Sequence, residues 1–367
     1  MADTMLLYIL ILFPLVIFTA IILYNFFTAP RLKNENYKSE EKPLISILIP
    51  ARNEEKNIAE CLNSVLNQTY KNYEVIVLDD NSVDNTKLIV KKYLNEKVKL
   101  IEGAELPTGW LGKNWACYQL SKTANGKLFL FLDADVRLHV NTVNAAVNVF
   151  YKYKLKMLSV FPVQKISSFG EYLIVPLLNW LLLTFLPLRK VYTSKRKSFS
   201  AAIGQFIIID KNTYNEIGGH KSVKNKIVED LEIARNLKSR GYKIMSVLGS
   251  GFVECRMYEN FTEAFKGFSK NFYPAFNSNI LNFLLLVLFL IVTFLSPFIL
   301  VFYELKFLFP VILILLGRIM IAQMSEQSKT LNVVLHPLQM LVMIVTAINS
   351  VLWTLNKRSE WKGRKIN

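Results

Sequence analysis

Long apolar runs near both ends of the chain constrain its fold more than any other feature. Met5 to Phe27 has one break, at Pro14, and Ile280 to Tyr303 and Leu331 to Leu355 are runs of similar character. A helix needs about 20 mainly apolar residues to cross the hydrocarbon core of a bilayer. Hydrophobic residues make up 52% of the 367 residues, above the usual share for a soluble domain. The sequence therefore predicts N-terminal and C-terminal transmembrane helices.

The N-terminal run is predicted to be a retained membrane anchor, residues 1–29. It lacks the basic region before the apolar stretch and the small-residue cleavage site after it that mark a signal peptide. Its flanks differ in charge, with Asp3 before it and a basic group after it: Arg31, Lys33, Lys38 and Lys42. Since basic flanks stay on the cytoplasmic side, the residues from about 30 onward are predicted to lie in the cytoplasm.

The C-terminal membrane region is predicted to cover residues 276–356. Between its two long runs, residues 307–322 form a shorter apolar stretch with Arg318, which we expect to dip into the membrane rather than to cross it. The tail, residues 357–367, is basic: Lys357, Arg358, Lys362, Arg364 and Lys365. A cytoplasmic tail requires an even number of crossings after Ile280, and two are expected. The protein is thus predicted to be a multi-pass protein of the cell membrane.

The net charge of the chain limits its partners. Lys and Arg outnumber Asp and Glu by 44 to 28, which gives a net charge of +16. Such an excess is typical of solvated faces, of a surface for anionic lipid headgroups or of a nucleic-acid binder. Because the chain has long apolar runs and no nucleic-acid-binding motif, we expect anionic lipid headgroups and no nucleic acid.

Cysteines and histidines show no spacing that would hold a metal or a disulfide framework. The cysteines are three in number and far apart, which favours a reducing compartment. The three histidines are equally scattered, without the spacing of a zinc site, and are predicted to be structural or incidental. These residues are Cys61, Cys117, Cys255, His139, His220 and His336.

From Leu44 the sequence changes to short apolar runs that alternate with amphipathic stretches. This alternation predicts an α/β domain, which we place at residues 44–275, with a parallel Rossmann-like sheet. In such sheets ligands lie at the carboxyl ends of the strands. The expected strands are 44–50, 74–80, 98–103, 128–135, 205–210 and 243–248, and the expected helices are 53–67, 84–95, 112–124 and 229–240.

One apolar segment inside this domain, residues 172–188, is short and contains Pro176 and Pro187. A spanning helix is one interpretation, and a re-entrant or interfacial helix on the lipid headgroups is the preferred one. The aromatic-rich run 261–276 is expected to serve as core, as an interface anchor or as a contact for a membrane-dissolved substrate. A basic cluster follows the first segment: Arg189, Lys190, Lys195, Arg196 and Lys197.

Two carboxylates, Asp133 and Asp135, close a purely apolar expected strand. Alternate residues of an extended chain point the same way, and two carboxylates held together repel unless a cation lies between them. Mg²⁺ or Mn²⁺ prefers such hard oxygen ligands and keeps open positions for phosphate oxygens. The alternative is a solvated acidic turn, because this tripeptide pattern also occurs by chance.

Two further polar clusters end a strand and begin a helix. Asp80 can accept hydrogen bonds from a nucleoside, while Ser82 can cap the following helix. Arg52 can steer a phosphate or a base, or it can pair with Glu54 or Glu55. Glu229 and Asp230 begin an expected helix, where negative charge is favourable in itself; the functional interpretation is a general base for an acceptor hydroxyl.

In this order and at these spacings, the clusters resemble the inverting family-2 glycosyltransferases of GT-A fold. The resemblance covers roughly residues 44–275 and implies a mixed α/β sheet, a nucleotide-sugar donor and Mg²⁺ or Mn²⁺ as cofactor. It also implies roles for single residues: Asp230 as catalytic base, Asp135 as metal ligand, and Pro50, Arg52, Glu54, Asp80, Asp133 and Glu229 as substrate-binding residues.

A second resemblance is narrower. Residues 108–120, TGWLGKNWACYQL, look like an element of glycosyltransferases that modify carotenoids and hopanoids. It implies Lys113 as a cation near the diphosphate, with a solvated helix lysine as the alternative. Together with Arg256-Met257-Tyr258 and the terminal membrane segments, it is similar to the 4,4'-diaponeurosporenoate glycosyltransferases. This implies carotenoid biosynthesis, with glucose moved from UDP-glucose to a carotenoid acid in the membrane. Gln205 is expected on the acceptor side.

One departure from the wider family concerns processive synthesis. Processive relatives carry a QxxRW motif after the acidic pair, whereas here Val253 and Met257 stand at the Gln and Trp positions and only Arg256 remains. Arg256 is still expected to bind substrate, at the diphosphate. The chain also has too few apolar runs for a long translocation channel. We therefore expect transfer of a single sugar.

Other functions remain open at this point. The acceptor can instead be a hopanoid, a glycerolipid or a polyprenyl phosphate, because the donor site would be unchanged. A non-catalytic membrane scaffold of the same fold is a further alternative, which the intact set of acidic residues disfavours. A transporter fits poorly, since the apolar runs are few and carry no charge except Arg318.

Overall fold

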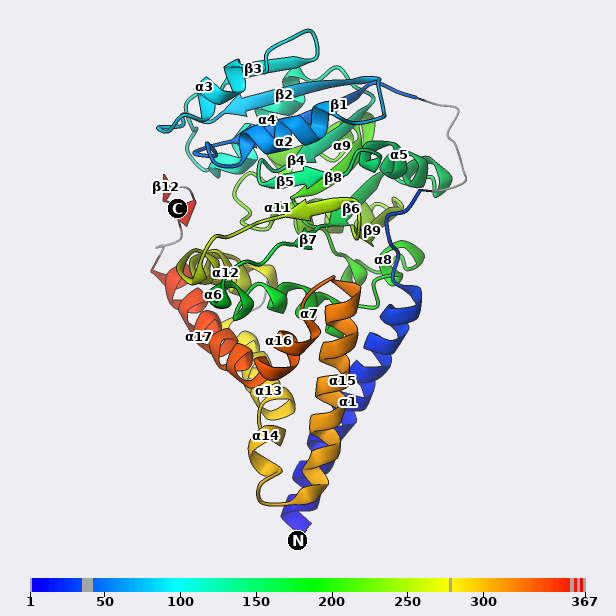
Figure 1. Cartoon of the computed structure of the whole chain (residues 1–367), viewed down its shortest axis with the longest axis vertical. Coiled ribbons are helices and arrows are strands. Elements are labelled where there is room, and N and C mark those ends of the chain that lie inside the picture. The colour runs from blue at the N-terminus through cyan, green and yellow to red at the C-terminus, as the bar shows by residue number, and fades with distance from the viewer. Residues whose placement is uncertain (1, 35–41, 277–278, 357–359, 362–363, 366–367) are drawn as a thin grey trace. The chain divides into compact units, whose positions relative to one another are not determined.

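The computed structural model describes residues 2–34, 42–276, 279–356, 360–361 and 364–365. The chain divides into two compact units (Figure 1). The α/β unit comprises residues 30–165, 189–256 and 360–367, and the helical unit comprises residues 1–29, 166–188 and 257–359. The helical unit thus takes in residues 166–188 and 257–275, which the sequence analysis assigned to the α/β domain.

A seven-stranded mixed sheet forms the centre of the α/β unit, in the order β3-β2-β1-β4-β8-β6-β9 (Figure 1). The strands from β3 to β4 are parallel, whereas β8 runs antiparallel to both β4 and β6. The parallel sheet expected from alternation is therefore wrong, because alternation does not tell in which direction a strand is entered. The strands are β1 (Ile45–Ala51), β2 (Tyr73–Asp79), β3 (Val98–Glu102), β4 (Leu128–Leu132), β6 (Met157–Phe161), β8 (Phe206–Asp210) and β9 (Ile244–Leu248).

A small second sheet and short helices complete this unit. The second sheet has the order β5-β10-β7, with β5 at Val136–Leu138, β7 at Val163–Gln164 and β10 at Val253–Cys255. Helix α4 packs on β1 and β2, while α5 contacts β6 and α11 contacts β9. The helices are α2 (Ile58–Leu66), α3 (Thr86–Lys91), α4 (Gly112–Thr123), α5 (Thr142–Lys152), α8 (Lys190–Thr193), α9 (Lys211–Glu216), α10 (Gly219–Ser222) and α11 (Glu229–Ser239), with a 3₁₀ turn η1 (Lys197–Phe199) and the two-residue strands β11 (Glu360–Trp361) and β12 (Arg364–Lys365).

The central strands are apolar because helices cover the sheet, and every residue of β1 and β2 is buried. Two of the polar exceptions, Ser46 and Glu74, are hydrogen-bonded to each other. Ser46 donates to Glu74 at 2.7 Å and accepts from the Gly126 N–H at 2.8 Å. A Cβ at position 126 would lie 2.5 Å from the Ser46 nitrogen. Glycine is therefore required where this loop crosses β1.

Most expected elements of this unit are confirmed, with shifts at their polar ends. The expected helix 53–67 begins only at Ile58, and the expected helix 84–95 is shortened to Thr86–Lys91. The strand expected at 128–135 ends at Leu132. The residues that leave these elements at the carboxyl end of the sheet, 53–57, 84–85 and 133–135, are polar except Ala134 and form loops. Their side chains hydrogen-bond to neighbouring loops, which competes with regular structure.

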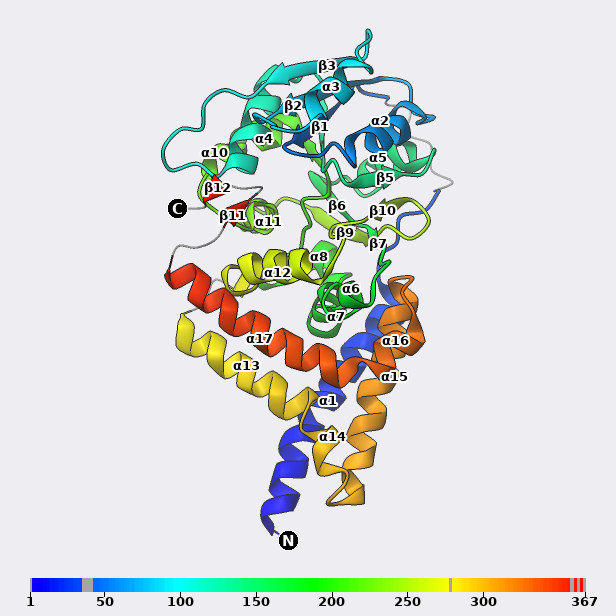
Figure 2. The ribbon, with the colours of Figure 1, turned by 60° about the vertical axis from the view of Figure 1, so that its left-hand side comes forward.

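The helical unit contains four helices long and apolar enough to cross a membrane, counted over the described residues. They are Thr4–Thr28, Ile280–Leu300, Leu305–Met324 and His336–Leu355, with mean hydropathies between 1.8 and 3.0. Helix α1 packs against α7, α13 and α15, and α17 packs against α12 and α13 (Figure 2). The helices are α1 (Ala2–Thr28), α6 (Phe169–Tyr172), α7 (Pro176–Phe185), α12 (Phe261–Phe276), α13 (Ile280–Phe294), α14 (Pro297–Leu300), α15 (Leu308–Met324), α16 (Lys329–Val334) and α17 (His336–Leu355), with a 3₁₀ turn η2 (Leu305–Phe307).

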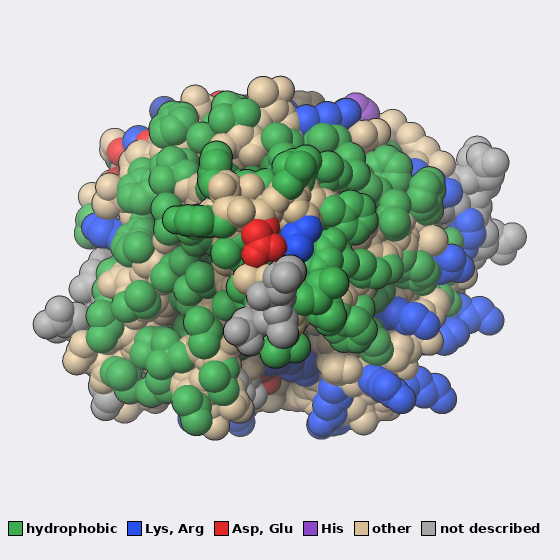
Figure 3. Space-filling view, turned by 90° about the horizontal axis from the view of Figure 1, so that it is seen from below, with side chains coloured by type: hydrophobic (Ala, Val, Ile, Leu, Met, Phe, Trp, Pro, Cys, Tyr) green, Lys and Arg blue, Asp and Glu red, His purple; other side chains and the backbone are tan. Residues whose placement is uncertain are grey.

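The outer faces of these helices are apolar, as a lipid environment requires. The face shown in Figure 3 is covered mainly by hydrophobic side chains. Phe13, Phe27, Leu281 and Leu352 are among the large apolar residues that stay exposed, Phe27 at 77%. Exposed apolar surface on this scale is unusual for a soluble protein. It fits helices whose surroundings are lipid.

A buried arginine connects three elements of the helical unit. Arg318 of α15 is 1% exposed, and its guanidinium donates to the Asn332 carbonyl at 3.2 Å, to the Asn332 side chain at 2.8 Å and to the Gln339 amide oxygen. Gln339 in turn donates to the Tyr172 carbonyl at 2.7 Å. The acceptors are all neutral. The cation therefore serves as a hydrogen-bonded cross-link between α15, α16 and α17.

One expectation for the membrane segments changes. Residues 307–322 were expected to be too short to cross, but Leu305–Met324 has 20 residues and qualifies by length. The apolar helical stretch Phe169–Phe185 belongs to the shorter class, and Trp180 and Leu183 in it are buried inside the unit. The number of crossings and the side of each terminus stay predictions. Most of the predicted basic tail, like Lys38, lies outside the described residues.

Candidate active site

The loops that follow β1 and β2 are joined by a series of hydrogen bonds. The Asn53 N–H donates to Ser82 Oγ at 3.1 Å, and the Val83 N–H donates back to Asn53 Oδ1 at 2.9 Å. The Glu54 N–H donates to Thr86 Oγ1 at 2.7 Å. Asn53 holds a left-handed φ of 52°, which asparagine tolerates better than most residues. The two loops thus form one rigid ledge at the carboxyl edge of the sheet.

Arg52 and Asp80 belong to this ledge. Arg52 Nη1 donates to the carbonyls of Asp80 at 2.6 Å and Asn81 at 3.1 Å, so part of its donor fork is used to hold the loop. Asp80 is 1% exposed. Asp79 is also buried, and its Oδ1 has no hydrogen-bond partner among the described residues. An orphaned buried carboxylate oxygen is costly unless a ligand satisfies it.

The expected capping role of Ser82 is wrong. Ser82 Oγ accepts from the Asn53 backbone instead of capping α3. The start of α3 is served by Asp84, whose Oδ1 accepts from the Thr86 N–H at 3.0 Å. Thr86 Oγ1 also donates to this oxygen, at 2.5 Å. The cross-loop bond takes Ser82 because the two loops lie side by side, which local sequence does not reveal.

Asp133 and Asp135 lie in a tight turn after β4 rather than on extended chain. The Val136 N–H donates to the Asp133 carbonyl at 3.2 Å, so the turn, and not strand alternation, brings the two carboxylates together. The Asp133 N–H donates to the Gln205 carbonyl at 3.2 Å. The Gln205 side chain faces inward: it donates to Cys255 Sγ and accepts from Gln164 at 3.0 Å. Gln205 therefore supports the turn from behind.

Negative charge dominates the surroundings of Asp135, although the Lys113 ammonium acts in the opposite direction. Burial raises the pKa of Asp135, and the nearby carboxylates of Asp133 and Glu54 raise it further. Its Oδ1 is buried and has no hydrogen-bond partner among the described residues. A bound cation would satisfy this oxygen and reverse the repulsion.

These residues fit a divalent cation of the hard type. Within the described residues no group of three or more His, Cys, Asp and Glu side chains could hold a metal alone. Mg²⁺ is commonly bound by one or two carboxylates together with substrate phosphates and water. Asp135, with Asp133 beside it, supplies that partial ligand set and leaves the rest to a substrate.

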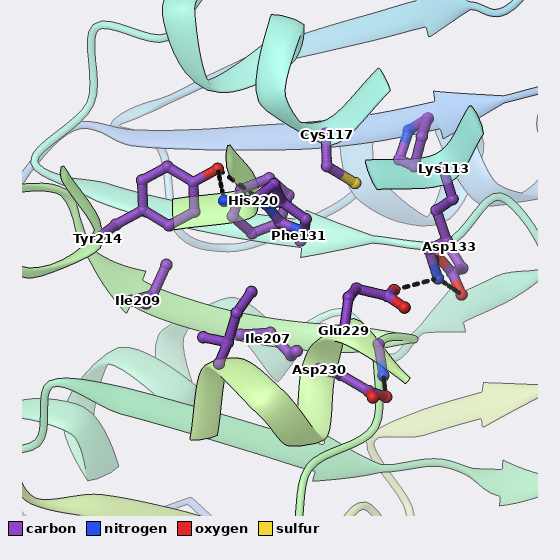
Figure 4. A pocket seen from close by; sticks show the side chains of 13 residues that line it. Lys113, Cys117, Phe131, Asp133, Ile207, Ile209, Tyr214, His220, Glu229 and Asp230 are labelled. Carbon is purple, nitrogen blue, oxygen red and sulfur yellow. Dashed lines mark hydrogen bonds and ion pairs between the residues drawn. The ribbon is translucent and has the colours of Figure 1, made fainter. Parts of the chain in front are cut away.

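Lys113 lies among the acidic residues (Figure 4). Its ammonium is 2.8 Å from both carboxylate oxygens of Asp133 and 3.7 Å from Glu229 Oε1. Burial lowers the pKa of Lys113, but the Asp133 and Glu229 carboxylates outweigh it, so the pKa lies well above its usual value. Lys113 therefore stays charged and ties the turn after β4 to the start of α11.

Asp230 faces the same place from the first turn of α11. Its Oδ2 accepts from the Gly204 N–H at 2.7 Å and its Oδ1 from the Leu231 N–H at 2.7 Å. Burial and the neighbouring Glu229 raise the pKa of Asp230 to about 7, against the opposing effects of Lys113 and the two N–H donors. A carboxyl with such a pKa can accept a proton at neutral pH, as a general base must.

A pocket joins these residues (Figure 4). Pro50, Lys113, Asp133, Glu229 and Asp230 all line it, together with Gly204. A Cβ at Gly204 would lie 3.0 Å from Lys113 Nζ and 3.5 Å from Glu229 Oε1, so glycine leaves room for the charged groups. Five predicted site residues from four separate segments thus meet at one pocket.

The other predicted site residues lie outside the pocket lining. Arg52 and Asp80 form the adjacent ledge, while Glu54 lies close enough to Asp135 to raise its pKa. Gln205 is 4% exposed and engaged by Gln164 and Cys255. Arg256 is exposed and directly follows β10. The roles predicted for these residues stay predictions.

Asn114 is a positioning residue that the sequence did not reveal. It is 1% exposed, and its amide donates to the carbonyls of Val223 at 2.9 Å, Lys224 at 3.2 Å and Lys226 at 3.0 Å. These carbonyls belong to the segment directly before Glu229. Asn114 thus fixes the approach to α11 from the next residue after Lys113. Its position beside Lys113 in the conspicuous 108–120 element was the one available signal.

The three cysteines are free and buried, and all lie near the site. Cys117 lines the pocket, Cys61 Sγ lies 3.8 Å from the Asp133 carbonyl, and Cys255 hydrogen-bonds with Asp135. Burial raises the pKa of Cys61 to about 12 and the pKa values of Cys117 and Cys255 further. All three thiols are therefore protonated at neutral pH.

Comparison with known proteins identifies the family of the chain. The chain belongs to glycosyl transferase family 2, whose family model matches residues 46–230. It is 29% identical over 238 residues to the 4,4'-diaponeurosporenoate glycosyltransferase of Staphylococcus haemolyticus (strain JCSC1435) and 31% identical over 241 residues to that of Staphylococcus aureus (strain MRSA252). These matches cover 64% and 65% of this chain, and it spans 62% of the length of each relative.

A solved structure confirms the fold. The mannosyltransferase PcManGT of Pyrobaculum calidifontis, solved with GDP-Man and Mn2+, superposes with a TM-score of 0.56. The superposition covers 95% of this chain and 99% of that one at 15% identity. The GT-A-like mixed α/β fold with apolar helices at both ends, expected from the resemblance, is thereby confirmed.

Proposed function

We propose that this protein is an inverting glycosyltransferase that moves a single sugar from a nucleotide-sugar to a lipid acceptor in the membrane. One observation carries the proposal: Asp133, Glu229 and Asp230 converge with Lys113 on one pocket beside the ledge of Arg52 and Asp80. The donor is UDP-glucose and the acceptor a carotenoid acid such as diaponeurosporenoate. The staphylococcal relatives bear that acceptor in their name.

The nucleotide half of the donor lies over the ledge. The buried Asp80 and the orphaned Asp79 Oδ1 are hydrogen-bond acceptors for the base and ribose of a nucleoside. The diphosphate then lies toward Asp135 and Asp133. There Mg²⁺ or Mn²⁺ would neutralise charge on the leaving nucleoside diphosphate. Support comes from the Asp135 oxygen without a partner and from the related mannosyltransferase, which was solved with GDP-Man and Mn2+.

Asp230 serves the acceptor. Inversion requires a single displacement in which the acceptor oxygen attacks opposite the leaving group. Two backbone N–H donors fix the Asp230 carboxylate, and its raised pKa suits proton transfer at neutral pH. A carotenoid carboxylic acid is already ionised at that pH, so the site must position it more than deprotonate it. Asp230 is then less critical than for a hydroxyl acceptor.

The membrane segments deliver the acceptor. Four apolar helices of spanning length accompany the transferase domain, and a lipid acceptor is confined to the same membrane. We propose that the α/β unit faces the cytoplasm, since Arg31, Lys33 and Lys42 follow the first apolar helix. The basic segment with Lys195, Arg196 and Lys197 is exposed and suits anionic lipid headgroups.

The decisive experiment measures release of UDP from UDP-glucose by the full-length protein in detergent. Mg²⁺ or Mn²⁺ and a panel of acceptors are added: a carotenoid acid, a hopanoid, a glycerolipid and a polyprenyl phosphate. We expect release only with the carotenoid acid, and its loss with EDTA or in the Asp133→Ala variant.

Other outcomes correct the proposal in defined ways. Release with a different acceptor would keep the transferase and replace its acceptor class. If no acceptor supports turnover and UDP does not bind in the presence of metal, the protein is a non-catalytic scaffold of this fold.

A further inference from the structure

The pocket has two ends of different character (Figure 4). Lys113, Asp133, Glu229 and Asp230 form the charged end, which the proposed function uses. The other end is closed by apolar walls, including Cys117, Phe131 and Tyr214, and by one polar ring, His220. These four side chains are between 2% and 5% exposed. The chemistry described so far gives this closed end no role.

His220 presents an unsatisfied nitrogen in this closed end. Its Nδ1 shares a hydrogen bond of 2.8 Å with the Tyr214 hydroxyl, which also accepts from the His220 N–H at 3.1 Å. Among the described residues, none hydrogen-bonds to Nε2. Burial lowers the pKa of His220 to about 3, so the ring is neutral at working pH. Since the residue is 4% exposed and lines the pocket, this nitrogen can be reached by a partner that enters the pocket.

The hydrogen bonds of Tyr214 define which group can pair with Nε2. The Tyr214 hydroxyl also interacts with the Ser121 side chain, so its proton can go either to His220 Nδ1 or to Ser121. In the first case Nε2 carries the ring proton and donates, and in the second it accepts. A hydroxyl group satisfies both tautomers. The partner is therefore most simply an alcohol.

The walls add a second constraint. An arm that reaches His220 lies in a pocket that Cys117 and Phe131 also line, with the Phe131 ring 4.8 Å from the His220 ring, and such apolar walls suit a methylene group. A carboxylate is disfavoured, because Asp133, Glu229 and Asp230 line the same pocket. A primary alcohol on one carbon, –CH₂OH, meets all of these conditions.

We propose that the closed end of the pocket is a subsite for the hydroxymethyl arm of a hexose donor, with His220 Nε2 paired to its hydroxyl. This inference rests on the proposed function, which places the reacting carbon of the sugar near Asp230. In a hexose the hydroxymethyl arm is only a few bonds from that carbon. The subsite selects a hexose over the same ring without the arm and over a uronic acid. His220 thus gains a specificity role in place of the structural one expected from sequence.

The test compares UDP-glucose with UDP-xylose, which has the same ring without the hydroxymethyl arm. Binding of UDP, UDP-glucose and UDP-xylose is measured by calorimetry with Mn²⁺, and kcat/KM is measured with the acceptor. The full-length protein in detergent is used throughout. The variants are His220→Phe, which keeps an aromatic ring but removes both ring nitrogens, and Cys117→Leu, which adds bulk at the closed end. His139→Phe is the matched control, because His139 is exposed and outside the pocket.

We expect the unmodified protein to prefer UDP-glucose by about tenfold or more, the range for one methylene and one hydrogen bond. His220→Phe and Cys117→Leu should each reduce this preference about tenfold, through loss on UDP-glucose rather than on UDP-xylose. His139→Phe should keep the preference of the unmodified protein. UDP-glucuronic acid should bind more weakly than UDP-glucose.

The outcomes separate this inference from the proposed function. If UDP itself does not bind, the proposed function fails. If UDP binds but UDP-glucose and UDP-xylose are equivalent, the closed end holds only water and the inference is wrong. The inference is equally wrong if the preference exists and survives in both His220→Phe and Cys117→Leu.

Discussion

Each unit of this protein holds a cation among polar side chains, half-buried at Lys113 and buried at Arg318, and the two cations have opposite surroundings. In the α/β unit, Lys113 pairs with Asp133 and Glu229 while Asp135 and Asp230 lie nearby with raised pKa values. In the helical unit, Arg318 donates only to neutral oxygens of Asn332 and Gln339 among the described residues. The cluster around Lys113 has more negative charge than this one cation can balance. The cluster around Arg318 has no negatively charged group among these acceptors.

This difference separates a site from a cross-link. Carboxylates without enough positive charge around them raise the free energy of the protein when no ligand is bound. Such a cost is typical of functional sites, where a bound ligand or metal balances the charge. Neutral oxygens that accept hydrogen bonds from an arginine hold the helices together. They carry no negative charge that could attract a metal ion or another positively charged ligand. The comparison predicts that changes at the first cluster act on catalysis and changes at the second act on stability.

Removal of the proposed metal ligand should have the largest effect. Asp135→Asn keeps the shape of the side chain but halves the charge of the Asp133–Asp135 pair. We expect kcat to fall about a thousandfold, since a metal contributes several kcal/mol to stabilising the departing diphosphate. Initial rates over a range of Mn²⁺ concentrations measure this. Glu216→Gln, at an exposed carboxylate, is the control, and a loss below tenfold for Asp135→Asn would refute the role.

Loss of the cation in the same cluster should have the next largest effect. Lys113→Met leaves Asp133 and Glu229 without their partner and removes a positive charge beside the pocket. We expect kcat/KM to fall about a hundredfold, as for loss of one positioned electrostatic group. Lys113→Arg should recover part of it. An unchanged kcat/KM in Lys113→Met would mean that Lys113 is only a structural ion pair.

The pH dependence of the rate should report Asp230. Its active form is the carboxylate, and its raised pKa means that this form is lost as the pH falls through neutrality. With a hydroxyl acceptor we expect kcat/KM to fall about tenfold for each pH unit below about 7, and with a carboxylate acceptor by less. In Asp230→Asn this limb should vanish. With a carboxylate acceptor the variant should keep part of its activity, whereas near-complete loss would indicate a hydroxyl acceptor.

The smallest catalytic effect is expected at the other cation. Arg318→Met leaves the acceptors on Asn332 and Gln339 unsatisfied, which costs about 1–3 kcal/mol of stability. We expect a lower unfolding temperature in detergent, and kcat/KM within about threefold of the unmodified protein. Thermal unfolding followed by intrinsic fluorescence, on the samples used for kinetics, tests both parts. If Arg318→Met lost activity without a lower unfolding temperature, the distinction between a catalytic cluster at Lys113 and a structural cluster at Arg318 would be wrong.

The sequence predicted those site residues that directly follow an apolar strand, because the end of a strand also fixes their position at the edge of the sheet. β1, β2 and β4 are apolar runs followed at once by polar residues, so Pro50, Asp80 and Asp133 were placed at neighbouring strand ends without coordinates. Adjacent strand ends in the order β2-β1-β4 then bring them together. Their detailed neighbours could not be predicted, because Arg52 and Ser82 are held by a loop about 30 residues away in sequence.

The features that escaped prediction depend on contacts distant in sequence. Asn114 reaches carbonyls 109 to 112 residues away, and no periodicity marks such a clamp. Residues 166–188 look like part of the α/β domain because they lie between two of its strands, yet they pack with the other helices. β8 entered the sheet antiparallel for a similar reason. The sequence pattern predicts whether a segment is a helix or a strand. Which other segments it packs against depends on contacts that form only in the folded chain.

The burial of the three thiols makes the protein convenient for chemical labelling. Maleimides and similar reagents attack the exposed thiolate, and Cys61, Cys117 and Cys255 offer neither exposure nor a low pKa. A single cysteine introduced at an exposed position such as Val83, which is 88% exposed, would be the reactive one. Fluorophores or spin labels can therefore be attached beside the donor ledge without first removing any native residue.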